Sequence, residues 1–221
     1  MSSLLHPDVL SQMGFPLRRD RPLIVSDVDE VLVRFIKGME DYLGERGLYY
    51  DWKHYDFDGT IRRRADEALV TREEMRQIHD GFLRDRLEHL EPVPGGAEAL
   101  IALSERAQIV ILTNLPAQAT EQRRRGLEKL GLRHPIVANI GGKGPAMRHL
   151  AALVEAPTFF LDDLPSHHAS VAVASPDTTR VHFVEDERLV KLMGVADSHH
   201  RTDQWPVARA FIEDRLFAAG F

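Results

Sequence analysis

Short, continuous apolar runs recur along the chain, and each is followed by polar residues. Runs in which apolar positions do not alternate with polar ones are typical of strands buried on both faces, as in a parallel sheet. Five runs have this character, and they are LIVSDVD from Leu23, IVILTN from Ile109, PIVANI from Pro135, TFFLDD from Thr158 and RVHFVE from Arg180. We therefore expect a mainly parallel sheet with at least these strands.

Helical patterns occupy the intervals between the later runs. They span residues 96–105, 117–130, 145–154 and 165–173. Pro145 and Pro165 suit the first turn of a helix, and Gly131 suits the position just after a helix end. Because strands alternate with helices, the pattern predicts an α/β fold in which a doubly wound, mainly parallel sheet forms the middle of three layers.

The interval after the first run breaks this rhythm, because residues 33–91 contain no convincing strand. Thr71 and Glu74 have the spacing of a capping box, which marks the start of a helix. We therefore expect a mostly helical insertion at residues 33–91. The α/β core would then consist of residues 1–32 and 92–221.

Composition and charge narrow the classes of function. The chain has 221 residues with a formal net charge of -6, which disfavours broad electrostatic binding of a nucleic-acid polymer. No apolar run approaches the roughly 20 residues needed to cross a bilayer, so we expect no membrane partner. The chain has no cysteine, which excludes a disulfide framework, a thiolate zinc site and a catalytic thiol. These features predict a cytoplasmic protein, and none of them predicts its oligomeric state.

Polar residues end several of the predicted strands. In open parallel sheets, ligands bind beyond the carboxyl ends of the strands, so residues at these ends are expected to share one site. The residues are Asp27 and Asp29 after the first strand, Thr113 and Asn114 after the second, Asp162 and Asp163 after the fourth, and Lys143 in a GGKGP turn.

This set of side chains predicts phosphoryl transfer. Several converging carboxylates repel one another unless a divalent cation holds them, and oxygen ligands without cysteine favour Mg²⁺. A lysine and a hydroxyl group can stabilise the charge that spreads over a phosphoryl group in its transition state. A carboxylate nucleophile can form an aspartyl-phosphate, which divides the displacement into two steps.

The order of these motifs resembles the four motifs of the haloacid dehalogenase (HAD) superfamily, most of whose members are phosphatases. The matching segments are DVDEVL at 27–32, LTN at 112–114, Lys143 and FLDD at 160–163. The resemblance extends from Leu23 to about Val184, and the insertion looks like the family's small helical cap after strand one. The chain departs from the pattern at Glu30, because many relatives have glycine after the second aspartate.

The resemblance implies a catalytic role for three residues. Asp27 would be the nucleophile and a magnesium ligand. Asp29 would act as general acid and then as general base, and its backbone carbonyl would also bind the metal. Lys143 would balance the charge between the nucleophile and the phosphate.

The resemblance also implies binding roles for the other motif residues. Thr113 and the amide of Asn114 would bind phosphate, together with Lys143. Asp163 corresponds best to the metal-binding acid of the last motif, and Asp162 would be an outer or second metal ligand.

Further candidates lie outside these motifs. His167, in the His167–His168 pair after the fourth motif, is a candidate contact for substrate or metal. The run Arg62, Arg63 and Arg64 in the insertion could bind a substrate anion, or it could be the solvated face of a helix. Both interpretations of the arginine run remain open at this point.

The sequence thus predicts a magnesium-dependent phosphomonoesterase that acts on a small phosphorylated metabolite, such as a nucleotide or a sugar phosphate, through an aspartyl-phosphate. A dehalogenase is an alternative, but the resemblance implies that dehalogenases lack the equivalent of Asp29. In a receiver domain of a signalling relay the lysine follows the last catalytic strand, whereas Lys143 precedes Asp162. A non-catalytic phosphate-binding protein on the same fold is a further alternative.

Overall fold

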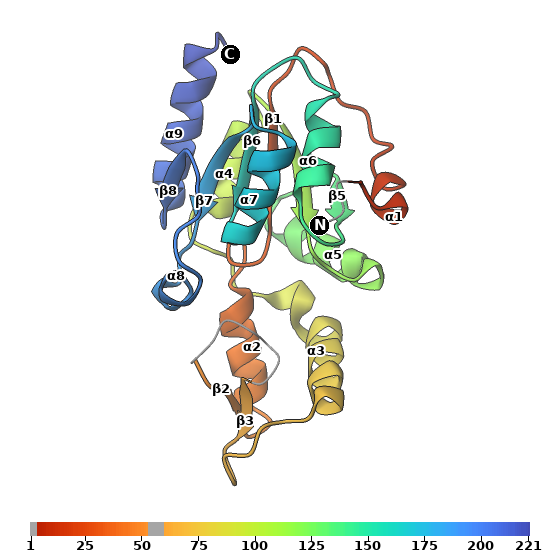
Figure 1. The fold of residues 1–221 in the computed structure, drawn as a ribbon, viewed down its shortest axis with the longest axis vertical. Helices are drawn as coiled ribbons and strands as arrows, with labels where there is room; N and C mark the ends of the chain where they lie inside the picture. The colour runs from red at the N-terminus through yellow and green to blue at the C-terminus, as the bar shows by residue number, and fades with distance from the viewer. Residues whose placement is uncertain (1–3, 53–59) are drawn as a thin grey trace.

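A parallel sheet of six strands forms the middle layer of the α/β core (Figure 1). The structure is a computed structural model, and it describes residues 4–52 and 60–221. The strand order is β5-β4-β1-β6-β7-β8, and every pair of neighbours is parallel. The strands are β1 (Leu23–Ser26), β4 (Gln108–Thr113), β5 (Ile136–Ala138), β6 (Thr158–Asp162), β7 (Thr179–Phe183) and β8 (His200–Thr202).

Helices cover both faces of this sheet. On one face lie α4 (Gly96–Leu103), α5 (Thr120–Lys129), which follows the short helix η2 (Ala117–Ala119), and α9 (Trp205–Ala218). On the other face lie α1 (Pro7–Leu10), α6 (Gly144–Ala151) and α7 (Pro165–Ala174). Successive residues of β1 alternate between these layers, because Ile24 belongs to the first hydrophobic cluster and Val25 to the second. The predicted three-layer, doubly wound α/β fold is confirmed.

The five predicted apolar runs correspond to β1, β4, β5, β6 and β7, whereas β8 is not predicted. This edge strand has only three residues, His200–Thr202, and two of them are polar or charged at exposed or half-buried positions. Two helices near the C-terminus, α8 (Glu187–Met193) and α9, are also absent from the predicted pattern. The first residue of α9, Trp205, is buried and donates a hydrogen bond of 2.7 Å to the Val31 carbonyl. The C-terminal helix is thereby joined to the loop that follows β1.

The segment between β1 and α4 extends beyond the carboxyl end of β1 (Figure 1). Its elements are α2 (Phe35–Gly44), β2 (Leu48–Tyr50), β3 (Ile61–Arg63), α3 (Arg72–Arg86) and the short helix η1 (Leu87–His89). The predicted capping box at the start of α3 is present, since the amide of Glu74 donates to the Thr71 hydroxyl and the amide of Thr71 donates to the Glu74 carboxylate. The insertion also contains an antiparallel hairpin of β2 and β3, which differs from the expectation. Strands of three residues are too short to show a two-residue period.

The chain leaves the core and returns to it through two adjacent segments. The Arg34 amide donates to the Glu91 carbonyl at 2.8 Å, and the Val93 amide donates to the Leu32 carbonyl at 2.9 Å. The insertion is therefore attached to the core by a two-stranded neck. No helix in the described part of the chain combines the length and apolarity needed to cross a membrane.

Candidate active site

The polar residues that end β1, β4 and β6 meet at the carboxyl edge of the sheet. β1 lies between β4 and β6, so this edge is the point at which the strand order changes direction. A cavity of about 180 Å³ opens there. Six of the predicted site residues line it, and they are Asp27, Asp29, Thr113, Asn114, Asp163 and His167.

Lys143 lies under this cavity with a side chain that is 0% exposed. Its ammonium nitrogen lies 2.7 Å from Asp27 Oδ2 and 2.6 Å from Asp162 Oδ2. Burial alone would lower the pKa of Lys143, but the two carboxylates outweigh it and the pKa is raised. The lysine is therefore held as a cation between two buried acids.

The glycines around Lys143 allow this position. Lys143 is the N-cap of α6, and the next residue, Gly144, donates its amide to the Ser170 hydroxyl at 3.0 Å. A Cβ atom at Gly144 would overlap the backbone carbonyl of Ser170. Only glycine lets the start of α6 approach α7 this closely, and this approach positions the lysine.

Asp27 is the carboxylate at the centre of the site. Its Oδ1 accepts a hydrogen bond of 2.7 Å from the Val28 amide, and its Oδ2 contacts Lys143. Burial raises the pKa of Asp27 to about 6, against the lowering effect of the Lys143 ammonium. The pKa of Asp27 thus lies closer to neutral pH than that of an ordinary aspartate, and additional positive charge would favour its ionised form.

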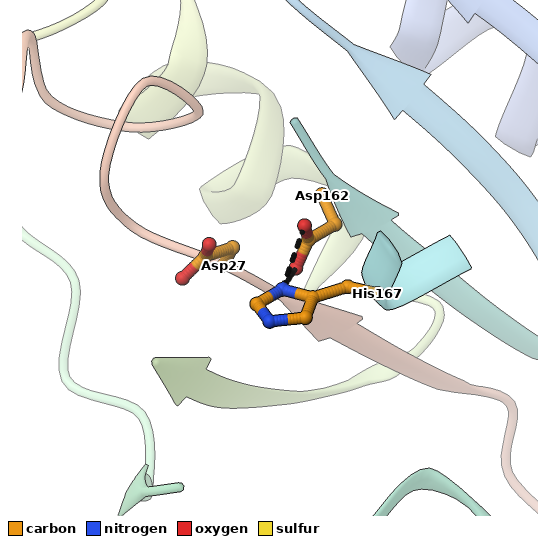
Figure 2. A group of neighbouring side chains, drawn as sticks. All are labelled: Asp27, Asp162 and His167. Atoms are coloured by element: carbon orange, nitrogen blue, oxygen red, sulfur yellow. Dashed lines mark hydrogen bonds and ion pairs between the residues drawn. The ribbon is translucent and has the colours of Figure 1, made fainter. Parts of the chain in front are cut away.

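Asp162 has a different environment, although it is fully buried. Its Oδ1 accepts the Leu164 amide at 2.9 Å, and its two oxygens lie 3.1 and 3.2 Å from His167 Nδ1. Burial opposes its charge, but Lys143 and His167 hold the pKa of Asp162 below its usual range. Figure 2 shows the His167 ring beside this carboxylate. Both Asp162 oxygens are therefore occupied in positioning Lys143 and His167.

Asp163 faces the same cavity as Asp27 and is 4% exposed. Burial raises the pKa of Asp163 well above its usual range, and the nearby charges of Asp162 and Asp27 raise it further. Its side chain makes no hydrogen bond or ion pair with any residue in 4–52 or 60–221. A buried carboxylate of this kind requires either a proton or a cation.

Two groups of side chains are candidates for holding magnesium. The first, Asp27 with Asp163, fits the ion better than the second, Asp27 with Asp162 and His167. Ligand atoms of Asp27, Asp162 and His167 also lie within 4.8 Å of one another (Figure 2). However, the Lys143 ammonium contacts both carboxylates of that second group and would repel a metal ion. Asp27 and Asp163 supply the oxygen ligands that Mg²⁺ prefers, and they share the open cavity.

Thr113 and Asn114 border the cavity from the end of β4. Thr113 Oγ1 is buried and has no hydrogen-bond partner within the described residues, so a ligand could bind it. The Asn114 side chain is engaged elsewhere, because it donates to the Gly141 carbonyl at 2.9 Å and accepts from Asn139 at 2.7 Å. Asn139 was not predicted, and its place at the end of β5 is the signal that could have identified it.

Asp29 forms an ion pair with Arg123, a residue that lies outside the predicted motifs. Arg123 lies on α5 within a QRRRG run, which has the composition of a solvated helix face. Leu127, one helical turn further on, belongs to the hydrophobic core. That four-residue spacing is the signal that places Arg123 on the buried face.

The insertion contributes Phe35, Ile36 and His79 to the cavity lining. The neighbouring core residue Glu30 has a left-handed backbone with φ of 58°, which is the conformation that favours glycine. Its carboxyl group accepts the Ile36 amide at 2.6 Å, and burial raises the pKa of Glu30 to about 8. This bond links the loop after β1 to the start of α2.

The arginine run lies on the β2–β3 hairpin and the turn after it, so its interpretation as a helix face is wrong. Arg62 pairs with Asp51 at 2.8 Å, and Arg63 pairs with Glu74. None of Arg62, Arg63 and Arg64 is among the residues that line the cavity. Their role in binding a substrate stays a prediction.

Comparison with solved structures gives the fold a family context. No protein-family model and no curated protein sequence matches this chain. A HAD-family hydrolase from Deinococcus radiodurans, solved with bound phosphate and sodium, is 19% identical with a TM-score of 0.61, over 90% of this chain and 98% of that one. A HAD hydrolase from Bacillus subtilis bound to magnesium is 12% identical with a TM-score of 0.56, over 89% and 100%.

An L-2-haloacid dehalogenase is also similar, at 10% identity and a TM-score of 0.59 over 88% of this chain and 99% of that one. The structural neighbours are thus HAD-family proteins that span nearly the whole chain. The predicted resemblance to the HAD superfamily is confirmed at the level of the fold.

Proposed function

We propose that this protein is a magnesium-dependent phosphomonoesterase that acts on a small phosphorylated metabolite through a phosphoryl-Asp27 intermediate. One observation carries the proposal. The buried Lys143 ammonium joins Asp27 to Asp162, and a second buried carboxylate, Asp163, faces the same cavity without a partner among the described residues. This arrangement has the charges needed to hold a divalent cation and a phosphate group together.

Magnesium would be held by Asp27 and Asp163, with the Asp29 carbonyl as a further ligand. The bound ion would supply positive charge that keeps Asp27 ionised and neutralises the phosphoryl oxygens. Thr113 and the Asn114 amide would bind the remaining phosphoryl oxygens. Their contacts would strengthen as charge spreads over the transferring group.

In the proposed reaction, Asp27 forms and then loses a bond to phosphorus, and Asp29 transfers the protons. A carboxylate oxygen of Asp27 attacks phosphorus, and the bond from phosphorus to the leaving oxygen breaks while Asp29 donates a proton to that oxygen. Asp29, now ionised, accepts a proton from a water molecule as that water attacks the aspartyl-phosphate. Inorganic phosphate leaves, and the Asp27 carboxylate and the protonated Asp29 are restored.

The insertion at residues 33–91 would act as a cap over the site. Phe35, Ile36 and His79 border the cavity from the cap, so they would contact the organic part of the substrate. The cavity volume of about 180 Å³ is below the roughly 300–1,000 Å³ of pockets for drug-sized ligands. A small phosphate ester would fit beneath the cap, whereas a nucleic-acid polymer would be excluded.

A dehalogenase function is the second candidate, because one structural neighbour is named as an L-2-haloacid dehalogenase. Asp29 argues against it, since a halide leaves without a proton and needs no general acid. Release of chloride from 2-chloropropionate would favour this alternative.

The test is phosphate release combined with the mass of the acid-quenched protein. Wild-type protein should release phosphate from p-nitrophenyl phosphate with magnesium, stop when EDTA is added, and carry one phosphoryl group on Asp27. Asp27→Asn should lose both phosphate release and the phosphoryl adduct, because an amide is no nucleophile. Asp177→Asn, at an exposed position, is the control and should behave as wild type. Mapping of the adduct to another residue, or full activity of Asp27→Asn, would refute the mechanism.

A further inference from the structure

Arg123 is a buried cation beside the site, although it does not line the cavity. Its side chain is 1% exposed, whereas that of its partner Asp29 is 25% exposed. Arg123 Nη2 donates to Asp29 Oδ1, and Asp29 is the only carboxylate paired with Arg123 in the described part of the chain. The guanidinium therefore holds Asp29 from the buried side, while the Asp29 carboxyl group remains open to the cavity.

Stability alone does not explain an arginine at this position. Arg123 Nε and Nη1 are buried and have no hydrogen-bond partner among residues 4–52 and 60–221. Buried donors without partners cost free energy, and a buried ion pair is often no more stable than apolar residues of similar size. The pairing is better explained by what it does to Asp29.

The elements around Arg123 keep it in place. Leu127, on the same face of α5, packs into the main hydrophobic core. Two residues of α5, Arg125 and Lys129, pair with Glu88 of η1 at 2.7 and 2.8 Å. α5 is thus attached to the core on one side and to the return segment of the cap on the other. A side chain on this helix has a defined position relative to the loop after β1.

We propose that Arg123 is a positioning residue for proton transfer, and this inference rests on the function proposed above. It holds Oδ1 of Asp29, which leaves Oδ2 directed to the proton exchanged first with the leaving oxygen and then with water. Without Arg123, the carboxyl group would rotate among several orientations, and few of them would meet the leaving oxygen. Misplacement of a catalytic group by about 1 Å can cost on the order of 100-fold in rate.

The experiment compares two aryl phosphates that differ in their need for a general acid. The p-nitrophenolate ion leaves without a proton, whereas the phenolate of phenyl phosphate benefits from one. The quantity is kcat/KM, because it reports the steps up to formation of the phosphoryl-enzyme. In Arg123→Met, kcat/KM for phenyl phosphate should fall about 100-fold and that for p-nitrophenyl phosphate less than about 5-fold, in line with general-acid effects of about 10²–10⁴.

Three further single variants and one double variant complete the series. Arg123→Lys keeps a cation and should recover part of the loss with phenyl phosphate, and it serves as the test if Arg123→Met does not fold. Arg124→Met removes the neighbouring arginine, which is exposed and pairs with Glu121 and Glu128, and it should leave both substrates unchanged. Asp29→Asn should show the same dependence on the leaving group. Adding Arg123→Met to Asp29→Asn should then cause little further loss.

A merely structural role predicts a different result, in which both substrates lose the same factor in Arg123→Met and Arg123→Lys. That result, in which the ratio of kcat/KM between the two substrates stays unchanged, would overturn the inference. Phosphoryl labelling of Asp27 in the wild type separates this failure from failure of the proposed function. If labelling occurs and the ratio does not change, only the role of Arg123 is wrong. If wild-type protein forms no phosphoryl-Asp27, the proposed mechanism and the inference fall together.

Discussion

The Lys143 ammonium lies 2.7 Å from Oδ2 of Asp27, in a position where the lysine is fully buried. The two residues are far apart in sequence. They meet because the end of β1 and the start of α6 lie at the same edge of the sheet. The lysine offsets part of the burial cost of the Asp27 charge, since it lowers the pKa of Asp27 while burial raises it. The contact therefore links the stability of the buried site to the ionisation of Asp27.

Replacing this lysine should affect both properties. Lys143→Met leaves Asp27 and Asp162 buried without their shared cation, and breaking a buried ion pair costs about 3–5 kcal/mol. We expect a loss of this order in the free energy of urea unfolding in EDTA, partly recovered with magnesium, and loss of phosphatase activity. Lys129→Met removes a half-exposed lysine that pairs with Glu88 and should cost about 0–1 kcal/mol. Equal losses in the two variants would contradict the role of Lys143.

Magnesium should stabilise the protein through Asp163. A ligand that binds only the folded state adds about 2.7 kcal/mol when its concentration is 100 times its Kd. Asp163→Asn removes a carboxyl group whose charge is opposed by burial and by three neighbouring acids, so the variant should be more stable than wild type in EDTA. It should also lose the stabilisation by magnesium, which thermal unfolding at several magnesium concentrations would measure. Asp177→Asn is the control, and an undiminished magnesium effect in Asp163→Asn would show that the ion binds elsewhere.

Gly144 should tolerate no side chain. A Cβ atom there would overlap the Ser170 carbonyl, so Gly144→Ala must displace either α7 or the turn that carries Lys143. We expect a loss of about 1–3 kcal/mol, as for other overpacked sites, together with reduced kcat. Gly14→Ala is a matched control, because no described residue other than its two chain neighbours has an atom within 4 Å of the added Cβ. The measurements are urea unfolding and phosphate release, and equal stability of the two variants would contradict this account.

His168 should make the fold sensitive to acid. It is fully buried, its Nε2 lies 2.9 Å from the Asp162 carbonyl, and burial lowers its pKa from 6.5 to about 4. Between these values the unfolded chain binds a proton that the folded chain does not, so stability falls as the pH falls. The contribution is fully present above about pH 6.5, and about 2 kcal/mol of it should be lost by pH 5.

The matching variant is His168→Gln, which keeps a donor for the Asp162 carbonyl but has no titrating group. Its free energy of unfolding should change about 2 kcal/mol less than that of wild type between pH 7 and pH 5. His89→Gln, at an exposed position, is the matched control variant. The same pH dependence in His168→Gln and wild type would contradict the assignment to His168.

Several features of this protein could be predicted from the sequence because they depend on local patterns. Continuous apolar runs indicated β1, β4, β5, β6 and β7, since a strand buried on both faces has little room for polar residues. The carboxyl ends of parallel strands share an edge, so Asp27, Thr113 and Asp163 could be assigned to one cavity before their contacts were known. The spacing of Thr71 and Glu74 predicted the capping box, because that motif is complete within four residues.

Other features were decided only by the tertiary structure. The β2–β3 hairpin and β8 are too short for their period to be recognised, and pairing with a neighbouring strand is what defines them. Arg123 and Asp29 are 94 positions apart, and the composition around Arg123 is that of a solvated helix. In the longer elements, local sequence determines the type of the element and which of its faces is apolar. The partner that a buried charge meets depends on how distant elements pack, and no local pattern records it.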